Sequence, residues 1–127
     1  MELDYDYTHK LLGCAYKVHS TLGPGLLESV YEAALVYELR LQGFEVKHQV
    51  PVKVYYGDII LDLDLRLDII VDDKVILELK SVSEILPVHK KQLLTYMRLT
   101  KTKLGYVINF NVDMLKDGGI ERIVNQL

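Results

Sequence analysis

Apolar and charged side chains alternate over most of the stretch between residues 59 and 72. Leucine, isoleucine and valine take the odd positions, whereas several even positions carry a charge: Asp62, Asp64, Arg66, Asp68 and Asp72. Successive side chains of a β-strand point to opposite faces, so this period predicts one strand with a single core face and a charged, non-core face. Residues 46–54 alternate in the same way, and residues 75–80 resume the pattern after a turn at residues 72–74. Because Pro51 cannot donate to a ladder, the first of these strands is expected to be an edge strand or bulged.

The two ends of the chain follow other patterns. Apolar residues at helical spacing predict three helices, at about residues 7–21, 26–42 and 88–100. Residues 104–111 are typical of a buried strand, and residues 119–125 favour a further short strand. A strand, a helix and a strand in that order call for a crossover and parallel pairing. The resulting order α-α-β-β-β-α-β predicts one α/β domain, residues 1–127, with a mixed sheet flanked by helices.

Composition and charge narrow the function. The single cysteine, Cys14, excludes an internal disulfide and lies in an apolar helical pattern, which favours a buried thiol. No apolar run approaches the length that spans a bilayer, and the acidic N-terminus is unlike a signal peptide, so we expect a cytoplasmic protein without membrane contact. The net charge is −3. A protein that binds nucleic acid through bulk electrostatics is basic, so such binding would here require a local patch, metal ions or an oligomer.

The hairpin at residues 72–74 has a predictable register. Opposed residues of an antiparallel pair share a face, so apolar positions must oppose apolar positions. A three-residue loop with Val71 opposite Val75 satisfies this condition. It places Asp68 opposite Glu78, and position 66 opposite Lys80.

Two opposed carboxylates repel each other unless a cation lies between them. Mg²⁺ is typically held by one or two carboxylates with water and phosphate. Asp68 on one strand and Glu78-x-Lys80 on the next therefore suit metal-assisted hydrolysis of phosphodiesters, with the lysine stabilising developing charge. The alternative is a solvated sheet face with cross-strand ion pairs.

Further polar residues are candidates for the same site. Glu28 lies one turn into a largely apolar helix, as a third carboxylate for the site or as an acid favoured by the helix dipole. His89, Gln92 and Tyr96 form a stripe on the third predicted helix, which is either part of the site or an exposed face. A basic cluster around this helix is either a phosphate-facing surface or a solvated face: Lys90, Lys91, Arg98, Lys101 and Lys103. Zinc-binding, nucleotide-loop and serine-hydrolase motifs are absent from the sequence, so no nucleotide cofactor is expected.

Several motifs together resemble the bacterial GxxExxY protein family. They are Gly25-Leu26-Leu27-Glu28-Ser29-Val30-Tyr31, Arg66-Leu67-Asp68, Glu78-Leu79-Lys80, His89 to Tyr96, and Ile108-Asn109-Phe110-Asn111. That family is placed in the PD-(D/E)XK nuclease-like superfamily, whose restriction-endonuclease-like core has the order α-β-β-β-α-β. The resemblance implies Mg²⁺ or Mn²⁺ bound by Asp68, Glu78 and the main-chain carbonyl of Leu79, a catalytic Lys80, and supporting roles for Glu28 and Gln92. Leu67 stands where the superfamily pattern has proline. Arg66, Tyr31, His89 and Tyr96 are further candidates within these motifs.

The leading hypothesis is therefore a metal-dependent nuclease acting on DNA or RNA. One alternative is a non-catalytic binding module that keeps the nuclease fold and acts through a protein partner or as a homodimer. Another is a hydrolase of small phosphorylated nucleotides, which would need little basic surface.

Overall fold

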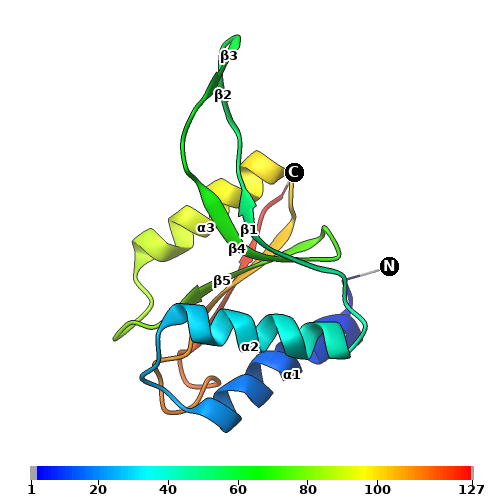
Figure 1. Ribbon diagram of the computed structural model, residues 1–127, viewed down its shortest axis with the longest axis vertical. Helices are drawn as coiled ribbons and strands as arrows, with labels where there is room; N and C mark the ends of the chain where they lie inside the picture. The colour runs from blue at the N-terminus through cyan, green and yellow to red at the C-terminus, as the bar shows by residue number, and fades with distance from the viewer. Residues whose placement is uncertain (1–2, 127) are drawn as a thin grey trace.

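Two helices begin the fold at nearly their predicted positions, in a computed structural model that describes residues 3–126 (Figure 1). Helix α1 (Tyr5–Leu22) is capped by Asp4, whose carboxylate accepts the main-chain N–H of Tyr7 at 2.9 Å. It ends at Gly23, which has φ of 72°, a value that favours glycine. Helix α2 (Glu28–Leu41) packs against α1, and the Cys14 thiol is buried, as predicted.

A five-stranded sheet follows the helices. Its strands are β1 (Val46–Pro51), β4 (Arg66–Val71), β5 (Val75–Lys80), β6 (Leu104–Asn109) and β7 (Ile120–Val124), in the order β1-β4-β5-β6-β7. Only β5 and β6 pair in parallel, and the helix that joins them is α3 (Pro87–Thr100). The mixed sheet, the parallel crossover and the final strand confirm the predicted fold class. Strand β1 is an edge strand, as Pro51 indicates.

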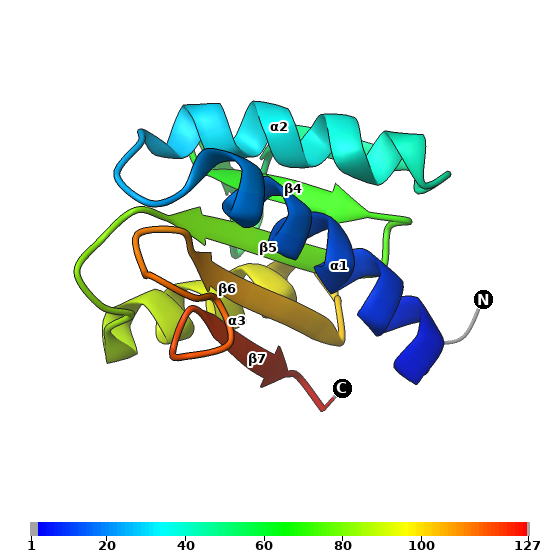
Figure 2. The ribbon, with the colours of Figure 1, turned by 90° about the horizontal axis from the view of Figure 1, so that it is seen from below.

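Each face of the sheet is covered. Helices α1 and α2 lie on one face and α3 on the other (Figure 2). Ile69, Val71 and Leu77 pack under α1 and α2, whereas Ile70 and Ile76 pack under α3. The expectation of a non-core face at the even positions is therefore wrong for Ile70 and Ile76, which α3 buries, whereas Asp64 and Arg66 are exposed.

The predicted continuous strand over residues 59–71 is also wrong. Beyond the paired strands β1 and β4, the Val52 N–H donates one more hydrogen bond between the two segments, to the Leu65 carbonyl at 2.8 Å. Beyond it the segments leave the sheet and pair with each other as β2 (Val54–Tyr56) and β3 (Ile59–Leu61) (Figure 1). We call residues 52–65 the arm. Alternation sets the direction of side chains, and it is the same in the sheet and in the arm, so the pattern does not reveal the break.

No helix within residues 3–126 is both long enough and apolar enough to cross a membrane.

Candidate active site

The β4–β5 hairpin has the predicted register. Val71 pairs with Val75, Ile70 with Ile76, and Ile69 with Leu77. The loop is the three-residue turn at positions 72–74. Since each of these pairs sums to the same number, the register extrapolates to Asp68 opposite Glu78, as expected.

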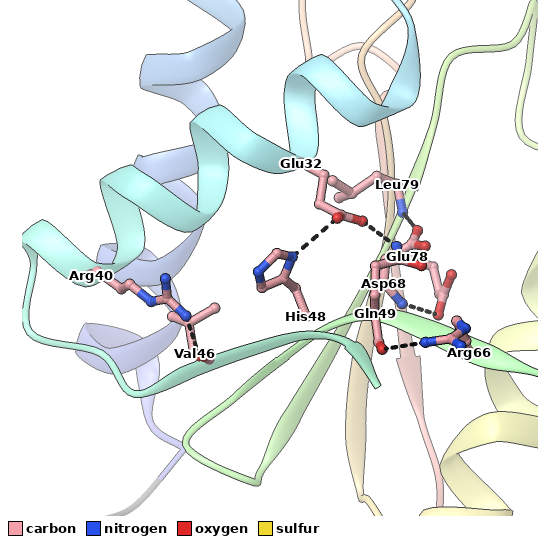
Figure 3. Close-up of polar contacts among 9 residues, drawn as sticks. All are labelled: Glu32, Arg40, Val46, His48, Gln49, Arg66, Asp68, Glu78 and Leu79. Carbon is pink, nitrogen blue, oxygen red and sulfur yellow. Dashed lines mark hydrogen bonds and ion pairs between the residues drawn. The ribbon is translucent and has the colours of Figure 1, made fainter. Parts of the chain in front are cut away.

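Beyond Ile69 and Leu77, hydrogen bonds from main-chain N–H groups to side-chain carboxylates replace the main-chain ladder. The Asp68 N–H donates to Oε1 of Glu78 at 3.2 Å, and the Leu79 N–H donates to Oδ2 of Asp68 at 2.8 Å (Figure 3). The two carboxylates thus hold the end of the hairpin together and lie close to each other. The main-chain ladder between β4 and β5 ends at Ile69 and Leu77, so the expected pairing of Arg66 with Lys80 does not form in it.

The Glu78 side chain is removed from water. Only 7% of Glu78 is exposed, whereas Asp68 is half-buried. Burial is the largest cause that raises the pKa of the Glu78 carboxyl, and the Asp68 carboxylate adds to it through charge repulsion and a shared hydrogen bond; together they bring this pKa to about 9. The site therefore holds a proton at neutral pH when no cation is bound.

Lys80 lies at the end of β5 and is half-buried. Its main chain is fixed, because its carbonyl accepts the Phe110 N–H at 2.9 Å. Its positive charge lowers the pKa of Glu78, but less than burial and Asp68 raise it. Lys80 alone therefore does not balance the two carboxylates.

Helix α2 brings a third carboxylate to the site. Oε2 of Glu28 accepts the Ser81 N–H at 3.1 Å, directly after Lys80. The Ser81 hydroxyl in turn donates to the Leu26 carbonyl at 2.7 Å. An open cavity of about 350 Å³ lies between α2 and the sheet, lined by Glu28, Ser29, Glu32, Gln49, Asp68 and Leu79.

The conformation of the loop before α2 explains why the motif at residues 25–31 has glycine at position 25 and tyrosine at position 31. Gly25 has φ of 96°, which a side chain would strain. The Tyr31 hydroxyl donates to the Gly23 carbonyl at 2.6 Å and accepts the Leu26 N–H at 3.1 Å. The Tyr31 ring stacks on Phe110 at 4.5 Å and is fully buried. Tyr31 thus anchors the loop that precedes the first turn of α2, and it does not line the cavity.

Residues of β1 complete the cavity wall. Gln49, at the position opposite Asp68, has φ of 51°, and its side-chain amide donates to Oε1 of Glu32 at 2.6 Å (Figure 3). The other oxygen of Glu32 lies 3.3 Å from Nδ1 of His48. Arg66 donates to the Gln49 carbonyl at 3.4 Å, so it borders the site without contacting either carboxylate of the hairpin. Sequence reasoning missed Glu32 and Gln49, and nothing in their spacing indicates the left-handed kink that brings them together.

Within residues 3–126, the residues of the predicted stripe on α3 make local contacts and no hydrogen bonds with the hairpin carboxylates. Nδ1 of His89 accepts the Leu86 N–H at 3.0 Å, so His89 caps the first turn of α3. Gln92 is exposed and donates to the Tyr96 hydroxyl at 3.4 Å. Tyr96 is buried in the core beneath α3. Neither Gln92 nor Tyr96 has a hydrogen bond to the hairpin carboxylates among the described residues.

Asn109 is a further residue that sequence reasoning did not assign. It is fully buried, and its amide accepts the Val82 N–H at 3.1 Å and donates to the Val82 carbonyl at 2.9 Å. It therefore fixes the loop that follows Lys80. The signal was the Asn109-Phe110-Asn111 motif, which was noted as part of a resemblance.

The donor set suits a hard divalent cation. The two hairpin carboxylates and the Leu79 carbonyl would supply oxygen ligands, and a buried pair of acids is stabilised by positive charge. Within the described part of the chain no group of three His, Cys, Asp or Glu side chains is arranged to hold a metal ion. Two carboxylates and a carbonyl leave coordination positions for water and phosphate, as Mg²⁺ requires.

Comparison with known proteins gives the family. No curated protein and no solved structure matches the chain. A sequence model described as the PD-(D/E)XK nuclease superfamily matches residues 5–123, and the five-stranded mixed sheet with flanking helices agrees with the fold expected of it. The narrower resemblance to the GxxExxY proteins stays a prediction. The chain belongs to the PD-(D/E)XK nuclease superfamily.

Proposed function

We propose that this protein is a nuclease that requires Mg²⁺ or Mn²⁺ and hydrolyses phosphodiester bonds of DNA or RNA in the cytoplasm. The observation that carries the proposal is the convergence of Asp68, Glu78 and Lys80 at the end of one hairpin, beside a cavity that Glu28 also lines. Family membership supports a nuclease-like function, although a fold does not fix a reaction.

Each residue has a role in this proposal. Asp68, Glu78 and the Leu79 carbonyl hold the metal. When bound, the metal supplies activation of water and polarisation of the phosphate. Lys80 donates to the phosphate or the attacking water and stabilises the negative charge that develops at phosphorus. Hydrolysis adds the water oxygen to phosphorus, breaks one P–O ester bond and delivers a proton to the leaving oxygen.

The remaining candidates position these groups. Glu28 fixes the main chain after Lys80 through the Ser81 N–H. Arg66 holds the kinked segment at Gln49. Gln92 lies on the first half of α3, from which its amide would reach a phosphate or a base. Lys90 and Lys91, on the same half of α3, provide local positive charge on a chain whose net charge is −3.

The test is cleavage by the purified protein. With Mn²⁺ or Mg²⁺ and labelled single- and double-stranded DNA and RNA, the wild type should cut at least one substrate, and EDTA should abolish the cut. Asp68→Asn and the double variant Glu78→Ala/Lys80→Ala should be inactive. Asp73→Asn, which changes an exposed acid in the turn of the same hairpin, is the matched control and should stay active. Cleavage that survives in the double variant would refute the proposal.

A binding module that keeps the fold without catalysis is the second candidate, favoured by the net charge of −3. Thermal melting separates the two. A metal that binds only the folded state raises the free energy of unfolding, and with it the melting temperature. At a metal concentration of about a hundred times the dissociation constant, the gain in free energy is about 2.7 kcal/mol. A nuclease requires this shift in the wild type and its loss in Asp68→Asn, whereas the absence of a shift supports the module.

A further inference from the structure

The arm exposes several large apolar side chains. Its strands pair only with each other, and it stands off the body of the molecule (Figure 1). Tyr56 is 73% exposed, and Tyr55, Ile59, Ile60 and Leu63 are each more than half exposed. Isolated two-stranded hairpins are marginally stable in water, and exposed apolar patches of this kind mark interaction sites.

Both faces of the arm carry apolar side chains. The pairing places Tyr56 and Ile59 opposite each other on one face, together with the pair Val54 and Leu61. The other face carries the pair of Tyr55 and Ile60. A hairpin that is apolar on both faces matches a segment covered by a partner on at least one of them.

The charges of the arm indicate the kind of partner. Asp58 at the tip and Asp62, which follows β3 toward the base, are exposed, and neither forms an ion pair within residues 3–126. These acids repel phosphate, so nucleic acid is a poor occupant. A partner with a basic surface next to an apolar one fits.

This chain itself carries such a surface at the C-terminal end of α3. Arg98, Lys101 and Lys103 are exposed, and none of them forms an ion pair in the described structure. The base of the arm lies against α3, because Val52 and Leu65 belong to the core beneath that helix. The basic end of α3 and the arm therefore occupy neighbouring parts of one surface.

We propose that the arm is a dimerisation element that docks on the arm and the basic end of α3 of a second copy of this chain. Two arms that pack antiparallel about a two-fold axis bring their apolar faces together. A strand rises about 3.3 Å per residue, so the tip lies about 17 Å from the base. Each acidic tip then reaches the partner's arm base, beside the partner's α3. A two-fold interface must be self-complementary, and the arm and α3 meet this requirement together.

The experiment is the molar mass in solution, measured by light scattering and sedimentation in EDTA without nucleic acid, so its result does not depend on nuclease activity. The wild type should be a dimer. Asp58→Lys/Asp62→Lys should raise the dimer dissociation constant about tenfold, the loss of about 1.4 kcal/mol, through repulsion of the partner's α3. Lys101→Glu/Lys103→Glu should do the same. The chain that carries all four changes should return to near wild-type affinity, because both surfaces are exchanged.

Other outcomes overturn the proposal. A wild type that stays monomeric at about 100 µM excludes a dimer of useful affinity. If the fourfold variant is as weak as the double variants, the tips do not meet α3. Tyr56→Ser/Ile59→Ser should dissociate the dimer, whereas Tyr37→Ser, which changes a 62% exposed tyrosine on α2, is the matched control and should not. Tip variants that alter binding of DNA but not the molar mass would identify nucleic acid as the occupant and end the proposal.

Discussion

Replacing Glu78 with glutamine should stabilise the metal-free protein at neutral pH. In the folded state burial and the neighbouring Asp68 carboxylate raise the pKa of Glu78 from 4.5 to about 9. A group whose folded-state pKa is raised contributes full stability below its unfolded pKa and loses it as the pH rises toward the folded pKa. Between pH 4.5 and 9 the unfolded chain releases this proton and the folded chain keeps it. Each pH unit in that window therefore costs the wild type about 1.4 kcal/mol, which amounts to about 3 kcal/mol at pH 7.

Glu78→Gln removes this dependence and keeps an oxygen that accepts the Asp68 N–H. The new amide N–H₂ needs partners, and an unmet one costs about 1–3 kcal/mol at every pH. The informative quantity is therefore the slope. The free energy of unfolding of the variant minus that of the wild type should increase by up to about 1.4 kcal/mol per pH unit between pH 5 and 8.

Urea denaturation in EDTA at several pH values measures this difference, and other titrating groups cancel in it. Glu84→Gln, which removes an exposed carboxylate outside the site, is the matched control for the loss of one charge. Addition of Mn²⁺ at pH 7 should stabilise the wild type and leave Glu78→Gln nearly unchanged, because the metal replaces the proton in the wild type. A difference that stays constant within about 0.5 kcal/mol from pH 5 to 8 would show that Glu78 titrates normally and refute the electrostatic account of the site.

Three further changes test other parts of the structure. Lys80→Met should lower the cleavage rate by about 10²–10⁴-fold while the shift in melting temperature with Mn²⁺ remains, as kinetics and melting would show together. Tyr31→Phe should cost about 1–2 kcal/mol in urea denaturation, since its hydroxyl bonds both Gly23 and Leu26; an unchanged stability would mean that the loop needs no anchor. Gly105→Ala should cost about 1–3 kcal/mol, because the added Cβ would lie 2.9 Å from Sδ of Met97 on α3. A stability equal to that of the wild type would show that this core can adjust.

The proximity of Asp68 and Glu78 was predictable because it follows from the alternation of apolar and polar residues along the two strands. A period of two fixes which residues share a face, and only one loop length keeps apolar residues opposite apolar ones, so Val71 had to meet Val75. That register brings Asp68 and Glu78 together without any knowledge of the rest of the fold. The roles of these residues in catalysis remain predictions.

The apolar cluster beneath α3 was indicated by the sequence but was not predicted. Ile70 and Ile76 are apolar residues on the face that was expected to meet solvent, and both are buried beneath α3. Their presence there argued for a covering element. The consequence is chemical, since Glu78 lies beside Val107 of this cluster, and burial is the largest cause that raises its pKa.

Contacts that depend on loops were out of reach. The hydrogen bond between Gln49 and Glu32 requires that Gln49 adopt the left-handed backbone conformation within an edge strand. A glutamine in the sequence does not predict that conformation. The departure of the arm from the sheet is similar. Its alternation continues that of the sheet, and only its apolar residues on both faces, such as Tyr55 and Tyr56, distinguish it.

The electrostatics of the hairpin end indicate the sign of what binds there. A buried carboxylate beside a second one destabilises the folded chain at neutral pH, and an apolar or amide side chain at position 78 would avoid that cost. Because Glu78 holds a proton at neutral pH when no cation is bound, the positive charge of Lys80 is balanced by Asp68, and a phosphate that approaches the unliganded site meets no net attraction. A cation that displaces this proton removes the internal cost and supplies the missing positive charge at once. The order of events that follows from these charges is cation first and phosphate second, and the same burial that weakens the empty fold strengthens its hold on the cation.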